Sequence, residues 1–131
     1  MNTWNFKIEL ESAGVFDRLS DEYGFDFPLD LQKFIIENNG ASPEEDCVEI
    51  NGVERVYDET LSFNEAEEEA TTVFDVMKSI DNDDYVPFAR DPFGNYFCYS
   101  VEKGTISFYD HEEDRIEDTD LSLEEFIKSL H

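Results

Sequence analysis

Histidine and cysteine are scarce in this sequence, which holds two of each among 131 residues. His131 is the last residue and His111 stands in an acidic loop, so neither belongs to a recognisable nucleophile motif. Glycine-rich phosphate loops, G-x-S-x-G elbows and H-E-x-x-H helices are absent as well. We therefore expect no catalytic residue and no cofactor. We interpret His111 as an exposed side chain whose proton is held by Asp110, Glu112 and Glu113.

The cysteine spacing excludes a disulfide-rich scaffold, because Cys47 and Cys98 form neither a C-x-x-C pair nor a dense framework. Both fall in strand-like segments, so we interpret them as reduced core residues. No apolar run is long enough to span a membrane, and residues 1–5 lack the charged and apolar parts of a signal peptide. These absences lead us to expect a cytoplasmic protein.

Basic residues are the third scarcity, with 9 lysines and arginines against 34 aspartates and glutamates, for a formal net charge of -25. Nucleic acids and anionic membranes attract proteins through lysine and arginine, so neither is expected as a direct partner. A field of this sign instead favours a cationic protein and can raise its association rate by about 10- to 1000-fold.

Apolar residues are plentiful despite this charge: 40% of the sequence is hydrophobic and 15% is aromatic. A chain of this length buries about two-thirds of its unfolded surface, which is enough for one core. No linker, repeat or low-complexity boundary interrupts the sequence. We expect a single domain over residues 1–131.

The first half of the sequence predicts two helices and a hairpin. Alternating apolar residues predict a strand over 4–10, and helical spacing predicts a helix over 12–23 that ends at Gly24. A second helix begins near Pro28 and ends at Gly40. The Asn51-Gly52 dipeptide, between β-like segments 47–50 and 53–57, is typical of a tight hairpin turn.

The second half predicts a helix, a strand meander and a closing helix. Asn64 resembles a helix start and leads through an acidic stretch into a helical apolar face at residues 73–80. Segments 85–89, 96–101 and 105–109 predict three strands, and residues 110–120 predict a polar connection. Ser122 and Glu125 predict a capping box at the start of the last helix. The fold class is therefore α+β, with an antiparallel sheet flanked by helices.

Acidic residues concentrate in three clusters, and these are the candidate partner-binding residues. A strong field of one sign destabilises a folded domain by self-repulsion, so binding of a basic partner would be a use for it. The clusters are Glu65, Glu67, Glu68 and Glu69; Asp81, Asp83 and Asp84; and Asp110, Glu112, Glu113 and Asp114. Residues 81–84 lack the central glycine and distal glutamate of an EF-hand loop, so we expect no metal site there.

Three segments together resemble the SUKH superfamily, which includes yeast cell-wall synthesis regulators and many bacterial immunity proteins. They are the proline-started helix with its Asn-Gly stop at 27–40, the paired strands and turn at 85–98, and the closing helix at 122–127. The resemblance implies an α+β fold without enzymatic activity. It also implies an immunity protein that binds a cognate toxin, often a nuclease and therefore basic.

Two alternatives remain open at this stage. One is a non-enzymatic protein- or peptide-binding regulatory module that uses a concave sheet face with Tyr96, Tyr99 and Phe108. The other, a carboxylate or metal-dependent hydrolase, is the least favoured, because acidic residues are so common here that chance pairs carry little information. The oligomeric state does not follow from the sequence.

Overall fold

Four helices form where the apolar periodicity predicts them, although one begins later than expected. The structure, a computed structural model, describes residues 2–80 and 82–131. The helices are α1 (Gly14–Tyr23), α2 (Leu29–Asn38), α3 (Val73–Ser79) and α4 (Leu123–Ser129). The predicted capping box at Ser122 and Glu125 is present at the start of α4, and Gly24 ends α1 in a left-handed conformation.

The main sheet has five antiparallel strands in sequential order, and its edge strand β9 was not predicted. It consists of β5 (Glu59–Thr60), β6 (Tyr85–Arg90), β7 (Tyr96–Ser100), β8 (Thr105–Asp110) and β9 (Arg115–Ser122). The prediction of a polar connection over 110–120 is wrong from Arg115 onward. An edge strand pairs on one side only and can carry charged residues, so its polar sequence masks its strand character.

Two short two-stranded sheets lie outside the main sheet. Strands β3 (Cys47–Ile50) and β4 (Val53–Val56) pair around Asn51 and Gly52, whose φ angles are 49° and 84°. Both positive angles fit the predicted type I′ turn. Strand β1 (Trp4–Asn5) pairs with β2 (Ser42–Pro43).

The strand predicted over residues 4–10 is wrong beyond Asn5. Phe6 has a φ of 64° and is 83% exposed, so it leaves the extended conformation and points away from the core. Ile8 then binds through its backbone to Asn39, whose main-chain oxygen accepts from the Ile8 amide at 2.8 Å. The segment after Phe6 is therefore held by single hydrogen bonds instead of a ladder.

The helix start predicted at Asn64 is also wrong. Thr72 is the N-cap of α3, and its side chain accepts a hydrogen bond from the Asp75 amide at 3.2 Å. Asn64 is buried, and its side-chain amide instead binds the backbone of Glu11 at 2.8 Å and of Glu9 at 2.9 Å. A buried tether to the N-terminal segment thus replaces the helix cap.

The core is built around Tyr57, which is fully buried and follows the β3–β4 hairpin. Its ring stacks on Phe97 with centroids 5.6 Å apart, and Phe97 lies 5.3 Å from Phe126 of α4. Each such buried side chain stabilises the fold by about 1.5–3 kcal/mol. Both cysteines are free thiols, and Cys98 in β7 is a core residue as predicted, whereas Cys47 in β3 is only half-buried and lies outside the core.

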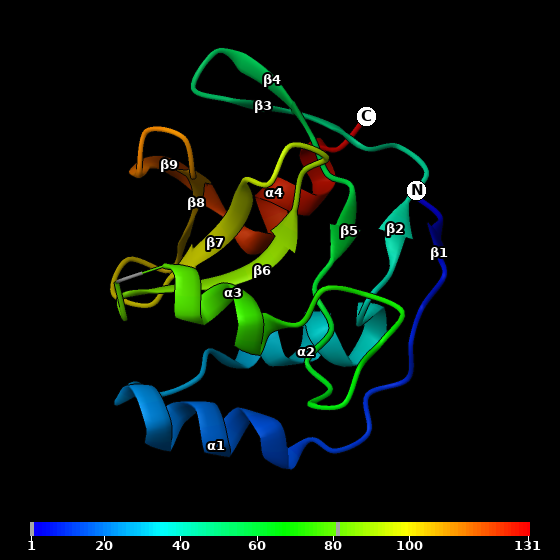
Figure 1. Cartoon of the computed structure of the whole chain (residues 1–131). Coiled ribbons are helices and arrows are strands. Elements are labelled where there is room, and N and C mark those ends of the chain that lie inside the picture. The colour runs from blue at the N-terminus through cyan, green and yellow to red at the C-terminus, as the bar shows by residue number, and fades with distance from the viewer. Residues whose placement is uncertain (1, 81) are drawn as a thin grey trace.

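Helices lie on both faces of the main sheet, with α3 packed mainly along β6. Figure 1 shows α3 in front of the sheet and α4 behind it, with α1 and α2 stacked below. The ring contacts of Phe126 with Phe88 and Phe97 place α4 on the aromatic face of β6 and β7. The helices of the described residues are all too short or too polar to cross a membrane.

Candidate functional site

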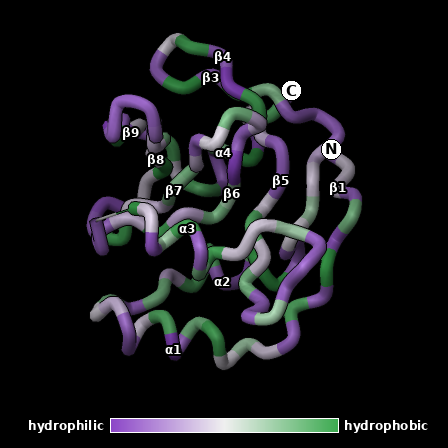
Figure 2. The backbone as a smooth tube through the Cα atoms, in the orientation of Figure 1, coloured by the Kyte–Doolittle hydropathy of each residue, from purple (hydrophilic) through white to green (hydrophobic). Residues whose placement is uncertain are grey.

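The three acidic clusters lie in three different loops. Glu65 to Glu69 belong to the connection between β5 and α3, and Asp83 and Asp84 precede β6. Asp110 ends β8, and residues 111–114 form the turn to β9. Asp81 lies outside the residues that the structure describes. Figure 2 shows hydrophilic stretches of the tube at all three places, separated from one another.

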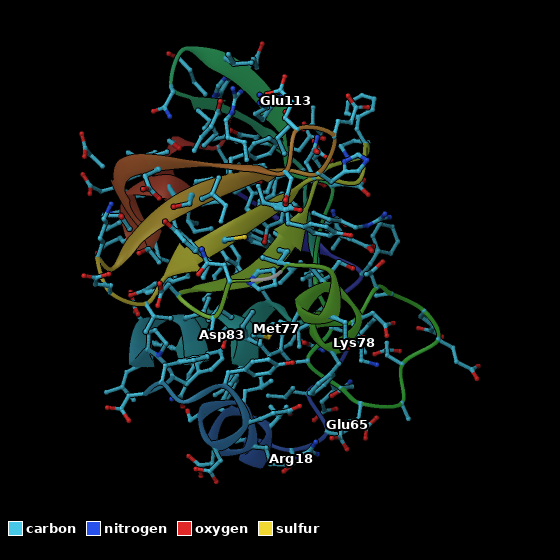
Figure 3. The ribbon with its side chains drawn as sticks, turned by 60° about the vertical axis from the view of Figure 1, so that its left-hand side comes forward. Arg18, Glu65, Met77, Lys78, Asp83 and Glu113 are labelled. Atoms are coloured by element: carbon cyan, nitrogen blue, oxygen red, sulfur yellow. The ribbon has the colours of Figure 1, made fainter. Side chains whose placement is uncertain are left out.

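The second and third clusters lie at opposite ends of the main sheet. At one end, the Val101 amide donates to the Asp84 carbonyl at 2.9 Å. At the other end, the His111 amide donates to Oδ1 of Asn95 at 3.1 Å. Figure 3 accordingly places Glu113 far from both Asp83 and Glu65. The second and third clusters are thus attached to opposite ends of the strands, although Asn82 and Asp114 line one hollow between them.

Two carboxylates of the first cluster are engaged within the molecule. Arg18 of α1 forms an ion pair with Glu65. The carboxylate of Glu67 accepts from Ser62 Oγ at 2.9 Å and from Asn64 Nδ2 at 3.3 Å. Burial acts to raise the pKa of Glu67, but these hydrogen bonds outweigh it and the pKa is lowered. Glu68 and Glu69 are exposed.

Most acids of the 110–114 turn stabilise the turn itself. Asp110 Oδ1 accepts the amide of Glu112 at 3.1 Å, and Asp114 accepts the hydroxyl of Tyr109 at 2.6 Å. Glu113 pairs with Arg115 at 3.0 Å. Three of the four acids therefore have an identified structural role, and Glu112 points into solvent.

The environment of His111 differs from the expectation that neighbouring acids hold its proton. Its Nδ1 atom lies 2.9 Å from Oδ1 of Asn95, and Asn95 Nδ2 donates to the buried carboxylate of Asp91 at 2.9 Å. The exposed imidazole therefore ties the β8–β9 turn to the β6–β7 turn. No nucleophile belongs to this chain of contacts, so the arrangement is structural.

The second cluster continues onto helix α1, an extension that the sequence analysis missed. Asp83 and Glu22 both lie close enough to Tyr23 to raise its pKa, after the larger effect of burial. Glu65 reaches Arg18 on the same helix. The rise of 1.5 Å per residue separates positions 18 and 23 by only about 7.5 Å along the axis. Helix α1 thus connects the first and second clusters.

We call this region the α1 acidic surface. It consists of Asp17, Asp21, Glu22, Glu65, Asp83 and Asp84, all exposed. Arg18 is the basic residue of α1, and Figure 3 shows it beside Glu65. Asp17 and Asp21 stand four residues apart on one helix face, and this spacing was the sequence signal that could have added α1 to the candidate site.

The remaining basic residues leave the overall charge largely uncompensated. Arg90, Lys103 and Lys128 pair with nearby carboxylates at 2.8–3.1 Å, outside the α1 acidic surface. Arg55 instead stacks over the Phe108 ring at 4.4 Å. With 34 acids and 9 bases in the chain, most surface carboxylates face solvent without a cation.

Two of the three aromatic side chains suggested for the alternative binding face are buried. Phe108 is fully buried, and Tyr99 is 6% exposed with its hydroxyl bound to both oxygens of Asp30 at 2.9 and 3.1 Å. Tyr96 is half-buried. Tyr99 and Phe108 are therefore core residues and do not form a binding face, whereas Tyr96 keeps part of its surface accessible.

Among the described residues, no group of three or more His, Cys, Asp or Glu side chains is arranged to hold a metal ion. What this surface offers is charge: a concentration of carboxylates that can accept hydrogen bonds and ion pairs from lysine and arginine. Carboxylates of this kind have the chemistry to pair with the lysines and arginines of a basic macromolecule.

The fold and this surface define a small, acidic α+β domain with an antiparallel meander and helices on both of its faces. The family model described as the SMI1 / KNR4 family (SUKH-1) matches residues 12–129. Because the match covers almost the whole chain, the protein belongs to this family, and the resemblance seen in the sequence is confirmed. A search of curated proteins gives no match.

Proposed function

We propose that this chain is a non-enzymatic cytoplasmic immunity protein that binds and neutralises a basic toxin of the nuclease type. The observation that carries the proposal is the α1 acidic surface, where the side-chain carboxylates of Glu22, Asp83 and Asp84 are exposed and accept no hydrogen bond from the described residues. Membership of the SUKH-1 family supports the proposal, since the superfamily includes immunity proteins.

The mechanism that we propose is occlusion. The carboxylates of the α1 acidic surface take the places of nucleic-acid phosphates and pair with the lysines and arginines that line the toxin's substrate groove. The net charge of -25 steers the two proteins together before contact. Neutralisation then requires only that the complex dissociates slowly, so that the toxin's substrate groove stays blocked.

Co-expression with the toxin encoded next to this chain tests the proposal. Protection of the cells is expected, and continued killing in the presence of soluble immunity protein would reject the pairing.

A matched pair of double variants tests the location of the site. Glu22→Gln with Asp83→Asn removes two charges from the α1 acidic surface, whereas Glu49→Gln with Asp120→Asn removes two exposed charges elsewhere. Both variants change the net charge equally. We expect the first to weaken toxin binding about tenfold more than the second, because local charge pairs act at contact. Equal losses would place the interface elsewhere.

A further inference from the structure

A second surface with the properties of a docking site lies between α2 and α4. It is a groove of about 460 Å³ whose apolar lining comes from Phe34 of α2 and from Leu123 and Ile127 of α4. Phe34 and Leu123 are nearly buried at 8% and 4% exposure, so they form a firm floor, while Ile127 is half-buried. The groove is not part of the α1 acidic surface.

The groove continues past the end of α4 into a neighbouring hollow of about 450 Å³. The two hollows share Ile127 and Lys128, and the second adds Trp4 of β1 and Leu130. Trp4 is held edge-on by Phe34 and Tyr57, with ring centroids 5.6 and 5.5 Å away. Together these hollows, here named the α2–α4 groove, form one elongated apolar depression.

The rim of the groove carries more carboxylates than cations. The acids are Asp30, Glu37, Glu45 and Glu124, and the bases are Lys33 and Lys128. Lys128 Nζ already donates to Glu124 at 2.8 Å, which engages one of the two cations. An occupant with basic flanks therefore complements this rim, whereas an anionic lipid or peptide does not.

The outer face of α2 extends the apolar character beyond the rim. Leu29 is 81% exposed and Ile36 is 46% exposed. They stand seven residues apart, with Lys33 between them on the same face of the helix. Large exposed apolar side chains next to an apolar depression are typical of protein contact sites.

We propose that the α2–α4 groove binds an apolar segment of another protein that is flanked by lysine or arginine residues. The inference rests on the proposed function only in that the partner is a basic protein. A second copy of this chain is a poor occupant, because each copy carries a net charge of -25 and the two would repel. Burial of the apolar segment would anchor the partner, while the acidic rim selects a segment with positively charged flanks.

Trp4 provides a direct report of occupancy, because it is the one tryptophan of the chain and lines the groove. The probe is a synthetic amphipathic peptide of leucine and lysine without aromatic residues. Its control is a peptide of the same composition in scrambled order, which matches any non-specific attraction to the acidic protein. We expect a saturable change in Trp4 fluorescence, with the amphipathic peptide binding at least about tenfold more tightly, or about 1.4 kcal/mol.

Two variants locate the effect. Glu37→Lys reverses an exposed rim charge, and Ile127→Ser removes a half-buried part of the lining; Glu49→Lys and Val53→Ser make comparable changes on the β3–β4 hairpin. The groove variants should weaken the amphipathic peptide about fivefold or more relative to the hairpin variants. If Ile127→Ser lowers the helical circular dichroism signal, Glu37→Lys alone decides.

Equal affinity for the two peptides, or equal effects of groove and hairpin variants, would overturn the inference. A concentration-dependent dimer that disappears in Glu37→Lys would overturn it in favour of a second copy. The peptide assay contains no toxin, so failure of the co-expression test together with a normal Trp4 response would remove the toxin proposal and leave the groove.

Discussion

Replacement of Asn39 by alanine should destabilise the protein more than any comparable change on its surface. Asn39 is fully buried just after α2, and its Oδ1 accepts from the Phe63 amide at 2.7 Å. Its Nδ2 donates to the Ile8 carbonyl at 3.1 Å and to Ser62 Oγ at 3.4 Å. One side chain thus joins the N-terminal segment to the connection after β5.

The magnitude follows from the groups that lose their partners. A buried donor or acceptor left without a hydrogen bond costs about 1–3 kcal/mol. Asn39→Ala leaves two such groups without their partner, the Phe63 amide and the Ile8 carbonyl. We expect a loss of about 2–5 kcal/mol, a large part of the roughly 5–15 kcal/mol that stabilises a typical domain. Urea unfolding, followed by Trp4 fluorescence and circular dichroism, measures it.

The adjacent residue supplies the control. Asn38 has the same side chain, but it is half-buried and donates only to the Phe34 carbonyl one turn earlier, at 3.3 Å. Asn38→Ala should change stability by less than about 1 kcal/mol, because alanine also improves helix propensity. A difference of under about 0.5 kcal/mol between the two variants would refute the role assigned to Asn39.

Asn39→Asp should make the stability of the protein depend on pH in a predictable direction. The introduced carboxyl group has a pKa of about 3.9 in the unfolded chain, and burial raises it in the folded protein. The variant should therefore be closest to the parent in stability below about pH 4 and fall behind it as the pH rises. A constant difference between pH 4 and pH 7 would show that the site is open to water.

Three further outcomes are expected. Ser122→Ala removes the capping box of α4 and should cost about 0.5–2 kcal/mol in urea unfolding, against a smaller loss for Ser129→Ala in the last turn. The hydrogen bond to Asp114, together with burial, raises the pKa of Tyr109 to about 12. The stability that the protonated Tyr109 contributes should therefore persist below about pH 10 and disappear as the pH rises through about 12. Asp114→Asn should lower the pKa of Tyr109 in an absorbance titration. Burial also raises the pKa of the Cys98 thiol, so a thiol reagent should modify it only as fast as the protein opens, and fast labelling of the native state would contradict the packing of β7.

Elements with a local chemical signal could be predicted from the sequence. The Asn51-Gly52 turn and the Ser122 capping box are local structures that only a few residue types can form. Pro28 marks the start of α2 as its N-cap, where its fixed φ of -60° is combined with an extended ψ of 133°. In each case the local preference and the tertiary structure agree.

The errors occurred where a long-range contact decides the outcome. Asn64 has the side chain of a helix cap, yet that side chain forms hydrogen bonds with the backbone of Glu9 and Glu11, more than fifty residues away in the sequence. Strand β9 lacks an apolar alternation because one of its edges is unpaired. Neither feature has a signature within its own segment.

The candidate site was only partly predictable for a related reason. The sequence identifies dense acidic segments. It cannot show that the carboxylate of Glu67 accepts hydrogen bonds within the molecule, or that Asp83 lies beside the end of α1. Those facts depend on how the loops fold back on the helices. The part of the site that the sequence missed, Asp17, Asp21 and Glu22, comes from α1.

The most direct test of the central claim is the association rate of this chain with its cognate toxin as a function of ionic strength. If a concentrated negative field captures a basic partner, the rate should fall by about tenfold or more between 10 mM and 500 mM salt, while the dissociation rate changes much less. An association rate that is independent of salt, with binding otherwise intact, would contradict the claim.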